Sequence, residues 1–310
     1  MFLEAMELKN FTDWNHTKIA VELERRHGVR VPSMTVYFWI TRRSTPLGHW
    51  NVFELKPSGE LAYVLGVMKG DGFRTSDKAQ GKEEIRLCVR DADFASHFNE
   101  AIAHVLERER PNKVSLEIRE DRDGAAFFRV RYSSLQLAEF LDRDLNSTRP
   151  FAEEHPADYL QGFFDSDGSA TPNLNRGRLY LRVLASNTNL ETLHYAKKIL
   201  FERFSIASSI YLDKQPGYSS LVYHKMVTKT KTSYRLSISS QDSVRAFSKS
   251  IGFSIKRKQC VLEDGLRLVD EYGSRRAAFY WPQLYEKAGR RWKRRETASY
   301  TLAQQSRSTQ

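Results

Sequence analysis

Two short segments of the sequence place an aspartate after a run of apolar and small residues, in the same order. They read LAYVLGVMKGDGF over residues 61–73 and ADYLQGFFDSDGSA over residues 157–170. Aligning them superposes Asp71 on Asp167, 96 residues further along the chain. An aspartate at the C-terminal end of a helix meets the negative end of the helix dipole, so a purely structural role is unfavourable there. The repeated placement favours a function for both carboxylates over the simpler interpretation that they only form turns.

Each aspartate is predicted to end a buried helix. The apolar spacing predicts helices over residues 59–71 and 156–167, and the Asp-Gly pair marks each stop because glycine permits a left-handed turn. Small residues one helical turn apart let two helix backbones approach closely. We therefore expect the two helices to pack in parallel against each other through Ala62, Gly66 and Gly162.

Parallel packing would bring Asp71 and Asp167 together, and divalent cations would relieve the repulsion between their carboxylates. Mg²⁺ typically takes one or two protein carboxylates and completes its shell with water and substrate phosphate. Metals bound in this way polarise a phosphodiester and activate water for its hydrolysis. The expected metal site comprises these two residues and the residues directly before them, Gly70 and Ser166.

The sequence around the two segments reads as a duplication. In the first unit the acidic helix precedes a strand over 85–89, a helix over 92–108, strands over 113–119 and 126–132, and a helix over 134–145. The second unit repeats this order, with strands over 178–185, 208–214 and 233–239, helices over 190–204 and 242–251, and a further helix from about Lys256. The sequence thus predicts an α+β protein with two pseudo-symmetric αββαββα halves, over residues 51–150 and 151–273.

The two segments resemble the LAGLIDADG motifs of homing endonucleases, and the resemblance extends over residues 57–270. It implies that each half lays a curved antiparallel sheet in the major groove of double-stranded DNA. It further implies a monomer that cuts a long specific target site with Mg²⁺, for which Mn²⁺ or Ca²⁺ substitutes in binding. The second acidic position of the motif corresponds to Asp71 and Asp167, which implies metal ligation there. The first acidic position is Lys69 in one copy and Asp165 in the other, a departure outside the metal-binding positions.

Phosphodiester cleavage also needs positive charge near the reacting phosphate. The stretch GFSIKRKQCVLEDGL, residues 252–266, resembles the part of this family in which a lysine near a helix start points toward the active site. The resemblance implies a catalytic role for Lys256 or Lys258, with a slight preference for Lys256. A solvated helix start near the DNA backbone is the open alternative. The first half shows no counterpart of this lysine.

Basic residues alternate with apolar ones along the predicted strands. Because successive side chains of a strand point to opposite faces, one set is expected in the core and the other toward the DNA groove. Taken singly, each more often contacts phosphate or solvent than reads a base. The outward candidates in the first half are Arg86, Arg90, Glu117, Arg119, Arg129 and Arg131. Those in the second half are Asn175, Arg176, Arg178, Tyr180, Arg182, Tyr211, Lys229, Lys231 and Arg235.

Residues 1–50 read as a separate helical unit. A helix over 17–26 is expected to end at Gly28, and Ser33 is a natural N-cap for a second helix over 34–43. Helix, short turn and helix form the layout of a helix-turn-helix module, whose second helix enters the major groove. A three-helix packing or dimerisation unit is the alternative. The residues that would face DNA are Ser33, Thr35, Tyr37, Arg42 and Arg43.

Composition narrows the class of partner. The chain has 310 residues and a formal net charge of +11, which favours a polyanion. We see no signal peptide and no run of 18 apolar residues, so we expect an intracellular protein, cytoplasmic or organellar, that acts on nucleic acid and not on a membrane. Cys88 and Cys260 lie far apart in apolar surroundings and are interpreted as core residues.

The C-terminal segment, residues 274–310, carries nine basic residues against two acidic ones, with Trp281, Tyr285 and Trp292 among them. A helix there either follows the DNA backbone or packs its aromatic residues on the core, and the two interpretations are compatible. The leading functional hypothesis is an intron-encoded type of DNA endonuclease. A non-catalytic DNA-binding regulator and an RNA maturase on the same fold are the alternatives.

Overall fold

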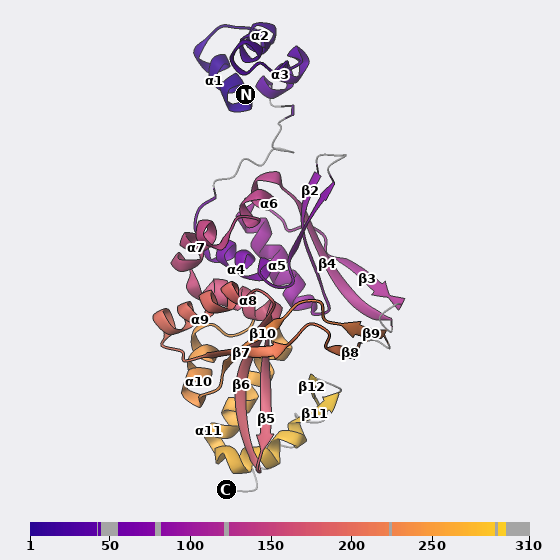
Figure 1. Ribbon diagram of the computed structural model, residues 1–310, viewed down its shortest axis with the longest axis vertical. Coiled ribbons are helices and arrows are strands. Elements are labelled where there is room, and N and C mark those ends of the chain that lie inside the picture. The colour runs from indigo at the N-terminus through magenta and orange to yellow at the C-terminus, as the bar shows by residue number, and fades with distance from the viewer. Residues whose placement is uncertain are drawn as a thin grey trace.

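The computed structural model describes residues 1–41, 43–44, 55–77, 82–120, 124–222, 225–288 and 291–295. Two separate hydrophobic cores are present in this part of the chain. The smaller core belongs to an N-terminal unit of three helices, and the larger one extends from Leu61 to Tyr285. Figure 1 shows the N-terminal unit apart from the rest of the molecule, which we call the main body.

The N-terminal unit consists of α1 (Phe2–Phe11), α2 (His16–His27) and α3 (Ser33–Ile40). As predicted, α2 ends at Gly28, which adopts a left-handed conformation with φ of 66°. The sequence did not reveal α1, because Ala5 is its only fully buried residue among the described ones. Ser33 does not cap α3: it is the first helical residue, and the N-cap position is occupied by Pro32, which makes no side-chain cap hydrogen bond. The helix also ends three residues before Arg43, contrary to prediction.

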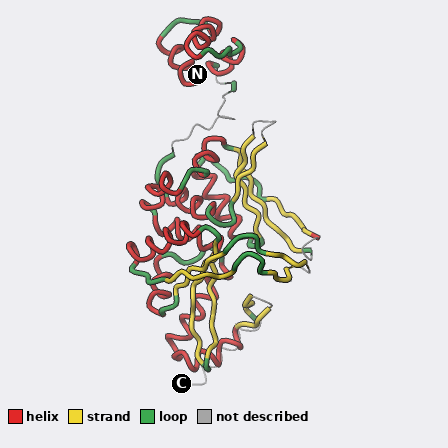
Figure 2. The backbone as a smooth tube through the Cα atoms, viewed as in Figure 1, coloured by secondary structure: helices red, strands yellow, loops and turns green. Residues whose placement is uncertain are grey.

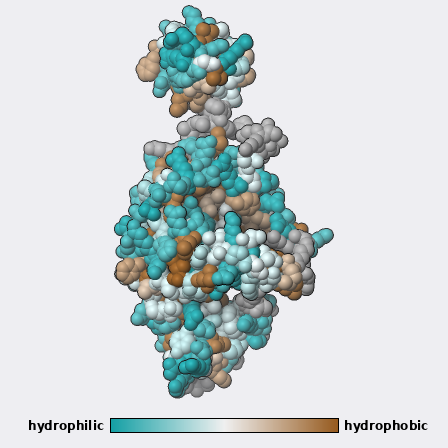
Figure 3. Space-filling view, in the orientation of Figure 1, coloured by the Kyte–Doolittle hydropathy of each residue, from teal (hydrophilic) through white to brown (hydrophobic). Residues whose placement is uncertain are grey.

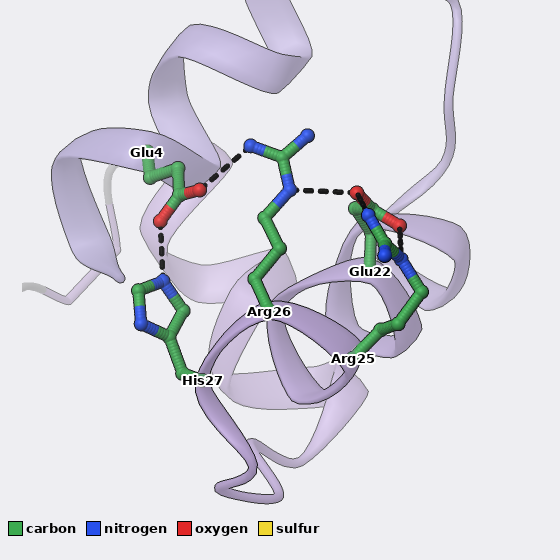
Figure 4. Close-up of polar contacts among 5 residues, drawn as sticks. All are labelled: Glu4, Glu22, Arg25, Arg26 and His27. Atoms are coloured by element: carbon green, nitrogen blue, oxygen red, sulfur yellow. Dashed lines mark hydrogen bonds and ion pairs between the residues drawn. The ribbon is translucent and has the colours of Figure 1, made fainter.

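Ion pairs tie α1 to α2 (Figure 4). Glu4 accepts one hydrogen bond from Arg26 at 2.7 Å and pairs with His27 at 2.5 Å. Glu22 accepts from both Arg25 and Arg26, and these two arginines lower its pKa to about 2. The arginines at the end of α2 are therefore engaged within the unit. In the view of Figure 3 the surface of the unit is mostly hydrophilic, with scattered apolar spots.

The main body contains two halves with the same element order. The first half comprises α4 (Gly59–Met68), β1 (Phe73–Asp77), β2 (Lys82–Val89), α5 (Ala92–Val105), β3 (Ser115–Arg119), β4 (Ala125–Ser133), α6 (Leu135–Leu141) and α7 (Leu145–Glu154). The second half comprises α8 (Pro156–Asp167), β5 (Gly168–Asn175), β6 (Arg178–Asn187), α9 (Leu190–Phe204), β7 (Ser209–Lys214), β8 (Ser219–Val222), β9 (Lys225–Thr228), β10 (Ser233–Ile238), α10 (Gln241–Ser250) and α11 (Lys256–Leu284).

Each half holds a four-stranded antiparallel sheet. The strand orders are β1-β2-β4-β3 and β5-β6-β10-β7, so corresponding strands occupy corresponding places. The predicted α+β fold with a duplicated unit is confirmed. Figure 2 shows the strands of the first sheet along one side of the main body and helices gathered on the other.

Some elements differ from prediction. The segments directly after the acidic helices, to which no strand range is assigned from the sequence, are β1 and β5. The helix predicted over 134–145 is two helices: α6 ends at Leu141 with Asp142 as its C-cap, and Asp144 caps α7 by accepting from the Ser147 N–H. The polar loop before β10 contains the β8–β9 hairpin.

The C-terminal aromatic residues pack on the core. Helix α11 bends at Gly273, where φ is 72°, and continues to Leu284. Trp281 and Tyr285 stack with ring centroids 4.3 Å apart, both almost fully buried, and Trp292 packs against Trp281 from a hairpin of β11 (Tyr285–Ala288) and β12 (Arg291–Arg294). Residues 296–310 lie outside the described chain. Within the described residues, none of the helices is long and apolar enough to cross a membrane.

Candidate active site between two packed helices

Helices α4 and α8 cross at two glycines. A Cβ atom built on Gly66 would lie 2.1 Å from the carbonyl oxygen of Tyr159, and one built on Gly162 would lie 2.2 Å from that of Tyr63. The two contacts are reciprocal, as expected for helices related by a pseudo-twofold axis. Because a side chain at either position would push the backbones apart, glycine sets the distance between the helices. The third predicted interface residue, Ala62, is fully buried.

The glycines that follow the two aspartates, Gly72 and Gly168, do not have the predicted structural role. Gly168 has φ of −91° and ψ of 163°, an extended conformation open to other residues, and Gly72 is likewise not among the positive-φ glycines. Space requires glycine at position 168, where a Cβ atom would lie 2.4 Å from the Phe164 carbonyl oxygen; at Gly72 a Cβ atom would lie 2.6 Å from the sulfur of the flexible Met68 side chain, which can move aside. The left-handed turn predicted at each Asp-Gly pair is wrong.

The carboxylates of Asp71 and Asp167 lie near one another beyond the packed part of this helix pair. Asp167 ends α8 as predicted, but α4 ends at Met68, so Asp71 lies in the turn three residues past the helix. Burial raises the pKa of Asp167 to about 7, and the negative charge of Asp71 adds to that increase. Burial also raises the pKa of Asp71, against the lowering effect of Lys258. A Cβ atom on Gly70 would lie 2.4 Å from the Ser166 Cβ and 3.1 Å from the Asp167 Cγ. The four predicted metal-site residues therefore come together.

Sequence reasoning missed Asn187, at the end of β6. Its amide nitrogen donates to Asp167 Oδ2 at 2.5 Å and to the carbonyl oxygen of Lys69 at 2.8 Å. The side chain thus joins the carboxylate of α8 to the end of α4. Its position two residues past a buried alanine at a strand end was the signal that could have drawn attention to it.

Of the two candidate lysines, the structure places Lys258 at the acidic helices. The Lys258 side chain is only 7% exposed, and its ammonium donates to the carbonyl oxygens of Asp165 at 2.6 Å and Phe164 at 3.2 Å. Burial lowers its pKa to about 8, which the carboxylates of Asp165 and Asp71 partly counteract. Lys256 is exposed, so the preference for Lys256 is corrected in favour of Lys258.

Asp165, the first acidic position of the second motif, is hydrogen-bonded within the protein to Tyr63 and Ser254. Asp165 is 1% exposed and accepts hydrogen bonds from Tyr63 Oη at 2.9 Å and from the backbone N–H and Oγ of Ser254 at 3.0 and 2.5 Å. It fastens the turn before α11 to both acidic helices. Its counterpart Lys69 is half-buried, and burial lowers its pKa.

The site suits a hard divalent cation that shares its ligands with substrate. No group of three or more His, Cys, Asp or Glu side chains in the described residues could hold a metal by itself. Burial raises the pKa values of both carboxylates, and the charge of Asp71 raises that of Asp167 further. They provide anionic oxygen ligands, the donor set that Mg²⁺ uses when water and phosphate complete its shell. The residues present therefore fit Mg²⁺.

In the first half, the predicted DNA-contacting residues share the sheet face turned away from the core. Arg86 lies opposite Arg131, and Arg129 lies opposite both Cys88 and Ser115 in the strand registers. Arg86 is paired with Glu84 next to it on the same face. Glu117 pairs with Arg119 and Arg129, and Arg90 is exposed just past the end of β2.

The second half repeats this arrangement. On β6 the buried residues Leu179, Leu181 and Val183 alternate with more exposed ones, and these are Arg178, Tyr180 and Arg182. Asn175 lies opposite Arg178, and Arg235 lies opposite Tyr211 and pairs with Asp213 at 2.6 Å. Arg176 sits in the β5–β6 turn with positive φ, and Lys229 and Lys231 are exposed beyond β9.

On the N-terminal unit, Ser33, Thr35 and Tyr37 are half-buried on α3, and Arg43 lies over the Tyr37 ring, 5.7 Å from its centroid. Arg42 lies outside the described residues. The most exposed large side chain of α3 is Met34. This helix contains no charged residue, so its predicted role in DNA binding would depend on polar and apolar contacts.

Comparison with known proteins finds a family model that matches most of the second half. Residues 154–252 match the LAGLIDADG-like domain. An uncharacterised protein of Methanocaldococcus jannaschii is 28% identical over 284 residues, covering 87% of this chain and 96% of that protein. A second uncharacterised protein of the same organism is 29% identical over 173 residues, covering 54% of this chain and 62% of its own length.

Solved structures that resemble this chain include I-DmoI in complex with DNA and Mn. The match has a TM-score of 0.43 and 20% identity, and it covers 63% of this chain and 97% of that one. Full-length DUF199/WhiA from Thermotoga maritima gives a TM-score of 0.44 and 17% identity over 84% of this chain and 70% of that one.

Proposed function

We propose that this protein, whose residues 154–252 match the LAGLIDADG-like domain, is a divalent-metal-dependent endonuclease that cleaves both strands of DNA at a specific site. One observation carries the proposal. Two glycine-packed helices bring Asp71 and Asp167 close enough for the charge of one to raise the pKa of the other, beside a buried lysine. This arrangement is electrostatically unfavourable for folding, as expected of a site kept for catalysis.

The residues would divide the chemistry as follows. Asp71 and Asp167, with the adjacent backbone of Gly70 and Ser166, would hold Mg²⁺, which when bound supplies Lewis acidity and an activated water. Asn187 orients the Asp167 carboxylate through its 2.5 Å hydrogen bond. The ammonium of Lys258 would offset negative charge that develops on the phosphate.

The two sheets would bind the DNA. Their outward faces present arginines from both halves, which suits contacts with the phosphate backbone and with guanine edges in the major groove. Because one chain contains both motif aspartates, a monomer would carry a complete active site. The N-terminal unit would extend the contact beyond the sheets. Ion pairs such as Arg129–Glu117 would exchange their carboxylate for phosphate on binding.

The test uses a plasmid library that carries genomic DNA flanking the gene, incubated with the protein and either Mg²⁺ or EDTA, followed by sequencing of the cut ends. We expect cuts at one site with Mg²⁺ only, and none with Asp71→Asn or Asp167→Asn, each of which should still bind that site in Ca²⁺. Tight site-specific binding without cutting by the wild type would instead identify a regulator. A preference for intron RNA over DNA would identify a maturase.

A further inference from the structure

The first turn of α11 contacts the opposite half of the molecule. The guanidinium of Arg257 donates two hydrogen bonds of 2.7 Å, one to each carboxylate oxygen of Asp91. The backbone N–H of Lys256 donates to Asp93 Oδ2 at 2.6 Å. Both aspartates lie at the start of α5, in the first half. Helix α11 therefore begins by docking on the first half, although it follows the second half in sequence.

The same turn is fastened to α8 on its other side. Ser254, just before the helix, donates to the Asp165 carboxylate, and Lys258 donates to the carbonyl oxygens of Asp165 and Phe164. Arg257 and Lys258 are neighbours in the chain that contact different halves. Any shift of the helix start that separates Arg257 from its partner would therefore displace the Lys258 ammonium from the ends of the acidic helices.

Comparison of the two halves shows that Asp91 serves more than its own helix. Asp91 is the N-cap residue of α5, yet its side chain makes no cap hydrogen bond. At the corresponding start of α9 the N-cap is Asn189, whose side chain accepts from the Thr192 N–H at 3.2 Å. A cap hydrogen bond typically stabilises a helix, so turning the Asp91 carboxylate toward Arg257 costs α5 this contribution.

We infer that the Asp91–Arg257 pair is a clamp between the two halves that positions Lys258 beside Asp71 and Asp167. A bidentate arginine–carboxylate pair fixes both distance and orientation, which a single lysine contact does not. The pair is partly exposed, with the Arg257 side chain 42% and the Asp91 side chain 19% accessible, so its contribution is to geometry more than to stability. Asp91 and Arg257 are thus positioning residues, and the activity part of this inference rests on the proposed nuclease function.

Asp91→Asn tests the clamp, because asparagine is as good an N-cap as aspartate and keeps the shape of the side chain. Its matched control is Asp270→Asn, which breaks the ion pair of Asp270 with Arg245 within the second half. We expect Asp91→Asn to lower the single-turnover cleavage rate about tenfold, with the DNA dissociation constant in Ca²⁺ and the melting temperature unchanged. Asp270→Asn should match the wild type in all three measurements.

Two further readouts separate positioning from a general structural effect. The backbone amide resonances of Ser254 and Lys258 should shift in Asp91→Asn and stay in place in Asp270→Asn, a measurement that does not need activity. The charge swap Asp91→Arg with Arg257→Asp should recover part of the lost rate. Unmoved resonances, or a swap variant no faster than Asp91→Asn, would overturn the clamp. Wild-type protein that never cuts would refute the proposed nuclease while the resonances still decide the clamp.

Discussion

Replacing Asp167 by asparagine is expected to stabilise the metal-free protein at neutral pH while abolishing DNA cleavage. The folded state raises the pKa of Asp167 from about 3.8 to about 7, by burial and by the charge of Asp71. Folding therefore favours the protonated carboxylate. Its ionisation lowers the free energy of unfolding as pH rises from about 4 through 7. Asparagine removes this charge and can still accept the hydrogen bond from Asn187 through its amide oxygen.

The size of the effect follows from the shift. Three pKa units correspond to about 4 kcal/mol at 1.36 kcal/mol per unit, which is the upper bound when Asp167 is fully ionised. The carboxylate is partly accessible and its titration is coupled to that of Asp71, so we expect a gain of about 1–3 kcal/mol at pH 8. Below pH 4 the wild type and the variant should be equally stable.

Scanning calorimetry in EDTA between pH 4 and pH 8 measures this, since it follows the main body separately from the smaller N-terminal unit. Asp242→Asn, which changes a fully exposed carboxylate, should leave the transition unmoved. Adding Mg²⁺ should stabilise the wild type and not Asp167→Asn. If Asp167→Asn melts below the wild type at pH 8 in EDTA, the electrostatic reasoning about this site is wrong.

Three other variants test the helix seam, the lysine and the DNA-binding surface. Gly162→Ala should destabilise the main body by about 3 kcal/mol or more in denaturant titration, because its Cβ would overlap the carbonyl oxygen of Tyr63. Lys258→Met should lower the single-turnover cleavage rate on the order of 100-fold and leave the affinity for DNA in Ca²⁺ unchanged. The double variant Lys229→Gln, Lys231→Gln should reduce the slope of log affinity against log salt by about 2, as measured by fluorescence anisotropy.

The sequence was most informative where periodic patterns were long. Helices α8 and α9 occupy the predicted residues 156–167 and 190–204, and the duplicated order of elements predicted two equivalent sheets. The start of β5 could not be predicted because the Asp-Gly pair indicates a turn, whereas the strand begins directly at Gly168, and Pro172 weakens the strand pattern. The local sequence alone could not reveal that α8 continues directly into β5.

The sequence could not predict the positions of side chains that depend on how distant elements pack against each other. Lys256 and Lys258 are two residues apart on one helix, so they point about 200° away from each other. Which of them faces the acidic helices depends on how α11 docks, and that is settled by contacts to Asp93 and Asp165 from distant parts of the chain. Asn187 is a single polar residue at a strand end, and of its two acceptors one lies on α8 and the other at the residue that follows α4.

The duplication explains both the symmetry of the site and its limits. The contact between α4 and α8 requires a glycine on each helix, Gly66 and Gly162, because the backbone of one helix fills the space that a side chain on the other would occupy. The surroundings of the two carboxylates carry no such constraint. Asp167 is held by Asn187, whereas the residue at the equivalent place near the end of β2 is Val89, which is buried and apolar. Asp71 is instead influenced by the charges of Lys258 and Asp91. A monomer with two halves can thus keep the geometry of a twofold site while giving each carboxylate its own electrostatic environment.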